Sequence, residues 1–167
     1  MNFREFLTLI ENIQLKLHEF SFEKYQPDVS EFGLKIEQDC LGELLIFMNS
    51  ELIILSDEFS ISTKSAVLLS GMITEYNLQN YFITAEPLMS AICLETEQIS
   101  EFENEISELE QKQMICVKEI DWQLLEEIEQ IDRSVYDSYA IPEKSQIPLC
   151  NKTFEFTEHF VNQIINL

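Results

Sequence analysis

Residues 32–61 decide the fold that this sequence predicts, and they read FGLKIEQDCLGELLIFMNSELIILSDEFSI. At the start of the stretch, Leu34 and Ile36 alternate with charged neighbours, as the side chains of a half-buried strand do. Two short apolar runs follow, from Leu44 to Met48 and from Leu52 to Leu55, with Asn-Ser between them. Short apolar runs joined by such turn residues are typical of hairpins. The stretch therefore predicts three consecutive antiparallel strands.

One amphipathic helix is predicted before these strands and another after them. The apolar residues of the first recur at helical spacing: Phe3, Phe6, Leu7, Ile10, Ile13 and Leu17. In the second helix, Ser62 or Thr63 can cap the first turn, because their hydroxyl groups accept hydrogen bonds from free backbone N–H groups. Its apolar face contains Ala66, Leu69, Ile73 and Tyr76, and Asn77 is a suitable last residue because Asn tolerates a positive φ.

Two further strands are expected from Tyr81 to Ala85 and from about Met89 to Glu95. Ser100 and Glu103 have the spacing of a capping box, which predicts the start of a third helix.

The apolar stripe of this third helix continues less regularly to Ile131, and the run from Met114 to Val117 fits a strand as well as a helix. A short last helix is predicted where Phe156, Phe160 and Ile164 share a face.

The predicted order is helix, three strands, helix, two strands, helix, and then a helical C-terminal extension. Runs of strands interrupted by helices form an α+β domain, here with a five-stranded antiparallel sheet. We assign residues 1–132 to this domain, and residues 133–167 to an extension packed on the same domain.

The charge of the chain indicates what kind of partner it can have. There are 31 Asp and Glu residues against 10 Lys and Arg, a net charge of −21, yet 46% of the residues are hydrophobic and 12 are Phe. A disordered acidic segment has few aromatic residues, so this chain is expected to fold. An acidic surface repels nucleic acid and anionic lipid and attracts basic proteins, and no apolar stretch approaches the roughly 20 residues of a membrane span. We expect a soluble, cytoplasmic protein with a protein partner, and neither nucleic acid nor a membrane as a partner.

The sequence contains no pattern that points to catalysis. It has no G-x-S-x-G, H-E-x-x-H, P-loop or G-x-G-x-x-G motif, and His18 and His159 are isolated from other potential metal ligands. The cysteines are far apart and are expected to be reduced and buried: Cys40, Cys93, Cys116 and Cys150. We expect no enzyme, no catalytic residue, no metal and no cofactor.

An acidic stretch lies between Glu95 and Asp132, with 13 acidic and two basic residues. Such a stretch can simply be the solvated face of a helix. It can also be a docking surface for a basic partner, where charge speeds encounter and disfavours wrong partners. The candidate docking residues are Glu101, Glu105 and Glu108.

The order of elements resembles that of the class I type III secretion chaperones, over about residues 1–125. The similar stretches are Gly33–Ile36 to Leu52–Leu55 for the three-strand block, Ala66–Leu69 to Asn77 for the second helix, Ile92–Glu95 for the last strand and Ile99–Trp122 for the closing helix. The resemblance implies a cytoplasmic homodimer that holds the N-terminal segment of a secreted effector in extended form and keeps it competent for secretion.

An exposed sheet edge suits such a task, because it accepts a peptide strand through main-chain hydrogen bonds. On this basis the candidate groove residues are Leu34, Ile36, Leu44 and Ile46. The candidate homodimer contacts are Leu69, Ile73 and Tyr76.

Three other functions are compatible with the same sequence. An immunity or antitoxin protein would block a basic toxin or nuclease with its acidic face, one-to-one and with strong salt dependence. A phage-encoded inhibitor that imitates nucleic acid would depend on salt even more strongly. An enzyme would need a pocket that the sequence does not reveal.

Overall fold

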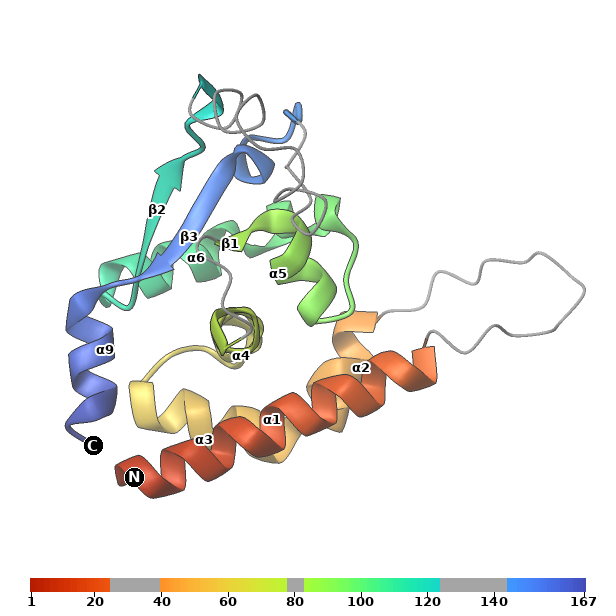
Figure 1. Cartoon of the computed structure of the whole chain (residues 1–167). Coiled ribbons are helices and arrows are strands. Elements are labelled where there is room, and N and C mark those ends of the chain that lie inside the picture. The colour runs from red at the N-terminus through yellow and green to blue at the C-terminus, as the bar shows by residue number, and fades with distance from the viewer. Residues whose placement is uncertain (25–39, 78–82, 124–143) are drawn as a thin grey trace, which may run out of the picture.

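The computed structural model describes residues 1–24, 40–77, 83–123 and 144–167. This part of the chain is mostly helical and contains one three-stranded antiparallel sheet (Figure 1). The helices are α1 (Phe3–Lys24), α2 (Cys40–Phe47), α3 (Asn49–Phe59), α4 (Thr63–Asn77), α5 (Ala85–Ala91), η1 (Thr96–Phe102), α6 (Glu103–Gln111), η2 (Pro148–Asn151) and α9 (Glu158–Ile165); the strands are β1 (Ile83–Thr84), β2 (Ile115–Glu119) and β3 (Lys152–Phe156). The prediction of a five-stranded sheet is therefore wrong.

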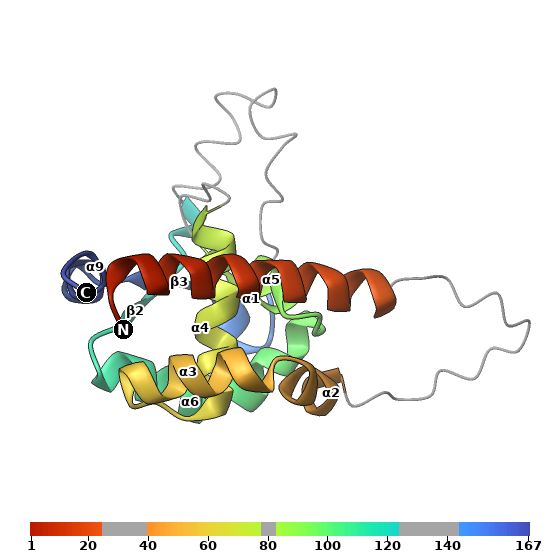
Figure 2. The same cartoon turned by 90° about the horizontal axis from the view of Figure 1, so that it is seen from below.

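Helix α4 lies at the centre of the molecule and is buried continuously from Ser65 to Ile73. It contacts α1 and α3 on one side and α5 and α6 on the other, and in Figure 2 helix α1 crosses over it. Of the two caps that the sequence allows, Ser62 is the one used, since the Ser65 N–H donates to the Ser62 hydroxyl at 3.1 Å. The start of α1 and the end of α9 lie side by side in both views.

The two apolar runs predicted as strands at residues 44–48 and 52–55 belong to helices α2 and α3. Their buried residues are spaced by three or four positions, as one face of a helix requires: Leu44, Met48, Leu52, Leu55 and Phe59. The side chains between them include Ile46, Ile53 and Ile54, which are exposed. A short, continuously apolar run cannot be assigned to strand or helix by its period alone, and this ambiguity caused the error.

The strand predicted from Met89 to Glu95 is also wrong, because Met89 lies in helix α5 and the chain then turns at Cys93, where φ is 59°. Helix α5 packs tightly against α4 at Gly71. A Cβ atom at Gly71 would lie 2.9 Å from Ile92 Cγ2 and 3.1 Å from Leu88 Cδ1. The absence of a side chain at Gly71 therefore allows the two helices to approach.

The long helix predicted after Ser100 is replaced by three shorter elements. Helix η1 begins earlier, with a capping box between Glu95 and Gln98. Helix α6 then ends before Gln113, where φ is 57°, and strand β2 follows. The strand alternative for the run from Met114 is therefore confirmed, and the part of the predicted helix beyond residue 123 lies outside the described residues.

The sheet has the order β1-β3-β2, so the last strand in the chain is the middle strand of the sheet. Phe154 pairs with Ile83 on one side and with Val117 on the other. Phe154 and Phe160 are both fully buried in the same core as α1 and α4. The segment that the sequence suggested as a C-terminal extension thus supplies the central strand and a helix to this core.

Candidate protein-binding groove

The four groove residues predicted from the sequence do not form a groove in the described residues. Leu34 and Ile36 lie outside the described residues. Leu44 and Ile46 are both in α2, but Leu44 is fully buried whereas Ile46 is 80% exposed. These two side chains therefore have different surroundings and share no surface.

The three predicted homodimer residues all lie in α4, and they differ in accessibility. Leu69 and Ile73 are buried, whereas Tyr76 is 55% exposed. A surface that contacts another molecule can therefore include Tyr76, with Ile73 beneath it.

Two of the three predicted acidic docking residues bind within the protein. Both carboxylate oxygens of Glu108 accept the Ser62 N–H at 3.1 Å, and Oε2 also accepts the Ser65 hydroxyl. The Lys64 ammonium lies 3.5 Å from Oε2 of Glu105. We call this set the α4–α6 polar contact (Ser62, Lys64, Ser65, Glu105 and Glu108). It holds α6 against the N-terminal end of α4. The third predicted docking residue, Glu101, has an exposed side chain.

The hydrogen bonds of this contact set the charge state of Glu108. Burial by itself would raise the pKa of the Glu108 carboxyl, but the hydrogen bonds from Ser65 and Ser62 outweigh it and hold the pKa below its ordinary value. Glu108 is therefore ionised at neutral pH, and its charge stabilises the start of α4, where free backbone N–H groups carry partial positive charge.

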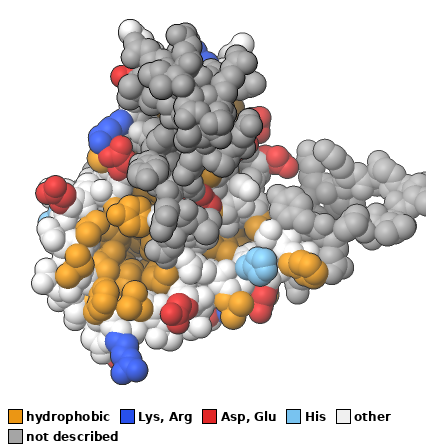
Figure 3. All heavy atoms as spheres, in the orientation of Figure 1, with side chains coloured by type: hydrophobic (Ala, Val, Ile, Leu, Met, Phe, Trp, Pro, Cys, Tyr) orange, Lys and Arg blue, Asp and Glu red, His pale blue; other side chains and the backbone are white. Residues whose placement is uncertain are grey.

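An apolar groove lies where α1, α4, β3 and α9 meet, with a volume of about 190 Å³. Figure 3 shows hydrophobic side chains gathered at the lower left, over the region where α9, α4 and the start of α1 lie in Figure 1. The groove is lined by Phe6, Leu7, Ile10, Ile73, Tyr76, Phe156, Val161, Ile164 and Ile165. Eight of these side chains are hydrocarbon, and the Tyr76 hydroxyl is the polar side-chain group among them.

Five aromatic rings contact one another in series, and three of them, Phe6, Phe156 and Tyr76, line this groove. Phe6 contacts Phe59 at 6.0 Å between ring centroids, and Phe59 contacts Phe160 at 5.2 Å. Phe160 contacts Phe156 at 5.4 Å, which in turn contacts Tyr76 at 5.5 Å. The two end members, Phe6 and Tyr76, both line the groove. Because edge-on and tilted ring pairs pack favourably, this series joins α1, α3, α9, β3 and α4 into one firm base.

The rim of the groove is exposed and apolar. Leu7 is 46% exposed, Tyr76 55% and Ile165 62%, and they come from three different elements. Single exposed apolar residues are ordinary, whereas a contiguous exposed apolar patch marks a surface that binds another molecule.

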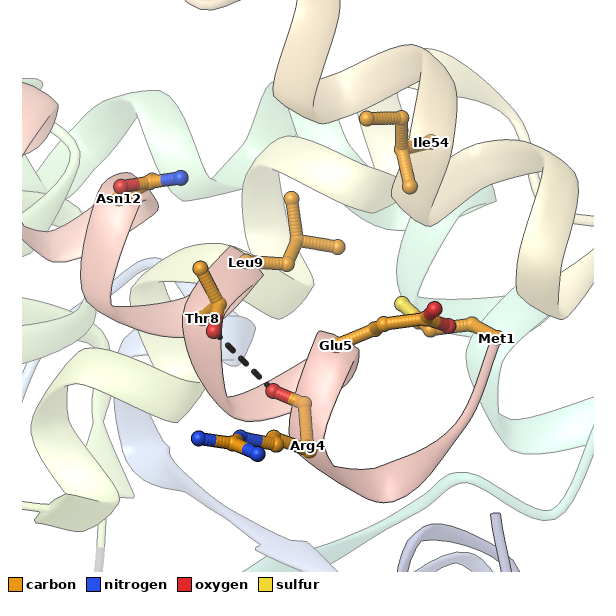
Figure 4. Close-up of a pocket in the computed structure, with 7 residues that line it drawn as sticks. All are labelled: Met1, Arg4, Glu5, Thr8, Leu9, Asn12 and Ile54. Carbon is orange, nitrogen blue, oxygen red and sulfur yellow. Dashed lines mark hydrogen bonds between the residues drawn. The ribbon is translucent and has the colours of Figure 1, made fainter.

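A second hollow lies between the start of α1 and α3, with a volume of about 530 Å³ (Figure 4). Leu9 of α1 and Ile54 of α3 line its two sides, and two of the polar residues beside them make hydrogen bonds near the start of α1. The Thr8 hydroxyl donates to the Arg4 carbonyl oxygen, and Glu5 accepts the Asn2 N–H at 2.8 Å. Two of its polar groups are thus already paired, and the Arg4 guanidinium and the Asn12 amide also line the hollow.

The remaining chemistry of the described residues is modest. Within the described ranges, no cluster of three or more His, Cys, Asp or Glu side chains is placed to hold a metal ion. The four cysteines are free, with Cys93 and Cys150 buried and Cys40 and Cys116 half-buried. Burial raises the pKa of the Cys150 thiol, so it is protonated at neutral pH. None of the helices described combines the length and apolarity that crossing a bilayer requires.

No known protein family matches the chain, and no curated protein or solved structure matches it.

The sequence predicted Ile73 and Tyr76 as contacts of a homodimer, but it did not predict that they form one groove with residues of α1, β3 and α9. One signal was present: Phe3 and Leu7 extend the apolar face of α1 beyond the stripe of Phe6, Ile10, Ile13 and Leu17. That extra width indicates apolar surface that the neighbouring elements do not cover, and both residues are more than 40% exposed in the structure.

Proposed function

We propose that this protein is a non-catalytic binding protein that takes an apolar segment of another protein into the groove between α1, α4, β3 and α9. The observation that carries the proposal is the exposed rim of Leu7, Tyr76 and Ile165 over a series of aromatic rings in which Phe6, Phe59 and Phe160 are buried. Protein interfaces concentrate their binding energy where a side chain enters a firm apolar pocket and water is excluded around it. The groove supplies such a pocket and such a rim.

The size of the groove limits what can enter it. An apolar cavity of about 150 Å³ accepts a benzene-sized group, and this groove has about 190 Å³. One aromatic or branched aliphatic side chain of the partner therefore fills it. Neighbouring apolar side chains of the partner would contact the exposed rim.

The charge of the chain favours a basic partner over a second copy of itself. Two copies would each carry an overall net charge of −21 and would repel each other. A partner that carries Lys and Arg beside its apolar anchor is attracted and guided to the groove. The proposal therefore uses Ile73 and Tyr76, the predicted homodimer residues, for contact with a different protein.

This proposal keeps part of the two functions suggested by the sequence. The type III secretion chaperone hypothesis depended on an order of elements that the fold does not have, and what remains of it is the binding of an apolar segment. The immunity or inhibitor hypothesis depends on acidic docking, for which Glu105 and Glu108 are already engaged within the protein. A basic toxin remains a possible partner, with the apolar groove as its anchor site.

The test compares capture of partners by matched variants in lysate of the native cell. Leu7→Gln and Ile165→Gln change exposed groove residues, and Leu15→Gln changes a 57% exposed leucine of the same helix α1 that does not line the groove. Circular dichroism and thermal unfolding verify that each variant is folded. The proposal predicts a partner that wild type and Leu15→Gln retain and that both groove variants lose. A partner that the groove variants retain, but that Glu101→Gln or moderate salt releases, would support acidic docking and contradict the proposal.

A further inference from the structure

Strand β2 lies at the outer side of the sheet, with β3 beside it and no described strand on its other side (Figure 1). Met114 and Ile120, which flank β2 in the chain, each make a main-chain hydrogen bond to a residue that flanks β3. Facing residues alternate along an antiparallel pair, so the even-numbered residues of β2 face β3 and the odd-numbered residues face away from it. The main-chain groups of Val117 and Glu119 therefore point outward from the sheet.

The accessible part of this outer edge begins at Val117. Ile115 is buried, Val117 is half-buried and the Glu119 side chain is 73% exposed. The Val117 N–H donates to Oε1 of Glu110 at 3.3 Å. Among the described residues, the Val117 carbonyl and the Glu119 main chain have no hydrogen-bond partner. Free main-chain groups on a strand edge can pair with an extended chain, whereas the main chain of a helix is already paired.

The charged side chains of β2 do not shield this edge. Proteins often protect an edge strand with charged residues, which make pairing with another chain unfavourable. Here Lys118 and Glu119, the two charged residues of β2, form ion pairs with side chains of β3. The side chain that contacts the outer edge is that of Glu110 in α6, and its hydrogen bond to Val117 exceeds the usual limit of about 3.2 Å. A partner can therefore replace it at little cost.

Glu110 also favours a partner of one charge. A segment that accepts the Val117 N–H displaces the Glu110 carboxylate, which then lies beside the segment and can pair with a Lys or Arg side chain. The net charge of −21 attracts such a segment. A second copy of the chain is disfavoured, because antiparallel pairing of two β2 strands around Val117 would bring two Glu110 carboxylates together.

We infer that the outer edge of β2, at Val117 and Glu119, binds an extended basic segment of another protein by adding it to the sheet as a strand. The main chain of the segment pairs with these two residues, and one of its Lys or Arg side chains pairs with Glu110. None of the residues that line the apolar groove belongs to β2. This surface is therefore separate from the groove, and either can bind without the other.

Three peptides test the inference with the isotope-labelled whole protein. The first alternates Lys and Val over about six residues, the length of an ordinary strand. The second has the same side chains but every main-chain N–H is methylated, and the third has Glu in place of each Lys. Nuclear magnetic resonance follows the backbone amide signals of Val117 and Glu119 during each titration, because a short edge is expected to bind weakly. We expect the first peptide to shift both signals, and the methylated and acidic peptides to bind at least about tenfold more weakly.

Matched variants test the two contacts of the first peptide. Val117→Pro removes the outward N–H and no hydrogen bond between β2 and β3, and Pro is tolerated at such edge positions. It should weaken binding about tenfold, whereas Val117→Thr, which keeps the N–H, should bind like wild type. Glu110→Gln should weaken binding several-fold, and Glu103→Gln, at an exposed position of the same helix, should not. Circular dichroism and thermal unfolding verify that each variant is folded.

Several results would overturn the inference. Equal binding of the methylated peptide, or undiminished binding by folded Val117→Pro, would exclude the addition of a strand at this edge. Equal binding of the acidic peptide would overturn the basic partner. The absence of any shift in the edge amide signals would overturn the site itself, and loss of binding in Leu7→Gln would assign the peptide to the groove instead. Capture of a partner through the groove is tested independently of all these results.

Discussion

The α4–α6 polar contact and the apolar groove lie on different parts of helix α4. In the polar contact, acidic residues are used inside the protein, whereas in the groove apolar residues are exposed to solvent. In the polar contact, Glu108 and Glu105 belong to the most acidic stretch of the chain, yet they bind Ser62, Ser65 and Lys64 within the protein. In the groove, residues such as Leu7 and Tyr76 have the spacing of core residues, yet they are half exposed. The partner surface that we propose is thus marked by exposed apolar side chains, and charge alone does not mark it.

The physical reason lies in what each kind of side chain gains from folding. A carboxylate near the start of a helix gains hydrogen bonds to free N–H groups and a favourable helix dipole, so acidic residues are readily used inside a protein. An apolar side chain gains only when it is removed from water. Exposed apolar side chains around a firm pocket are therefore available to a partner in a way that the paired glutamates are not.

The largest expected effect on the free energy of unfolding comes from a change in the series of five aromatic rings at the groove. Phe160→Ala removes a fully buried ring that contacts both Phe59 and Phe156. Loss of a buried Phe side chain costs about 3–5 kcal/mol in the free energy of unfolding, which urea denaturation measures. Leu15→Ala, at an exposed position of α1, should change stability by less than about 1 kcal/mol. A cost for Phe160→Ala no larger than this control would show that the five rings are not packed as a unit.

A smaller effect on the free energy of unfolding is expected from a change in the α4–α6 polar contact. Glu108→Gln removes the charge that accepts hydrogen bonds from Ser62 and Ser65. We expect a loss of about 1 kcal/mol in the free energy of unfolding, as for other helix-start contacts. The matched control is Glu19→Gln, at an exposed position of α1, which should have little effect. Equal effects of the two variants would mean that Glu108 contributes only as one surface charge among many.

The pH dependence of the stability of Glu108→Gln tests whether the ionised carboxylate is the cause of the expected loss. The pKa of the Glu108 carboxyl is lowered in the folded protein from its ordinary value of 4.5. A lowered pKa means that the folded state binds the proton less readily than the unfolded state, so the contribution of Glu108 is complete above pH 4.5. It is lost as the pH falls through the folded-state pKa. The difference in unfolding free energy between wild type and Glu108→Gln should therefore be constant from neutral pH to about pH 5 and shrink below that. A difference that grows on acidification would contradict the assignment.

The smallest effect is expected at an ion pair outside both regions. Lys16 Nζ lies 2.7 Å from Glu51 Oε2 and joins α1 to α3, with the two side chains 30% and 13% exposed. A double-mutant cycle with Lys16→Met and Glu51→Gln should give a coupling of about 0.5 kcal/mol that falls as salt is added. A coupling as large as the Glu108 effect would show that acidic residues act alike wherever they lie, and would remove the distinction drawn for the α4–α6 polar contact.

Several features of the fold followed from local pattern. Helix α1, the cap of α4 at Ser62 and the helix containing Phe160 were predicted because a long or well-capped amphipathic stretch has one dominant period. Phe156, which was predicted on the same helix face as Phe160, lies in strand β3 instead. The runs around Leu44 and Leu52 were assigned to strands wrongly, because four or five consecutive apolar residues satisfy both periods. Only two of the groove residues, Ile73 and Tyr76, were predicted to contact another molecule, and they were assigned to a homodimer interface.

The sequence alone determined the acidic charge, the amphipathic helices and the cap of α4, because these depend on composition or on residues within a few positions of one another. Tertiary structure decided that Lys152–Phe156 forms the middle strand between β1 and β2, and that Phe6, Tyr76 and Ile165 meet around one groove. Those outcomes depend on contacts between residues far apart in the chain, whose formation requires closing long loops and filling a common core. Local periodicity can show that a side chain is apolar and on one face of a helix, but only the packing of the other elements determines whether that face is covered.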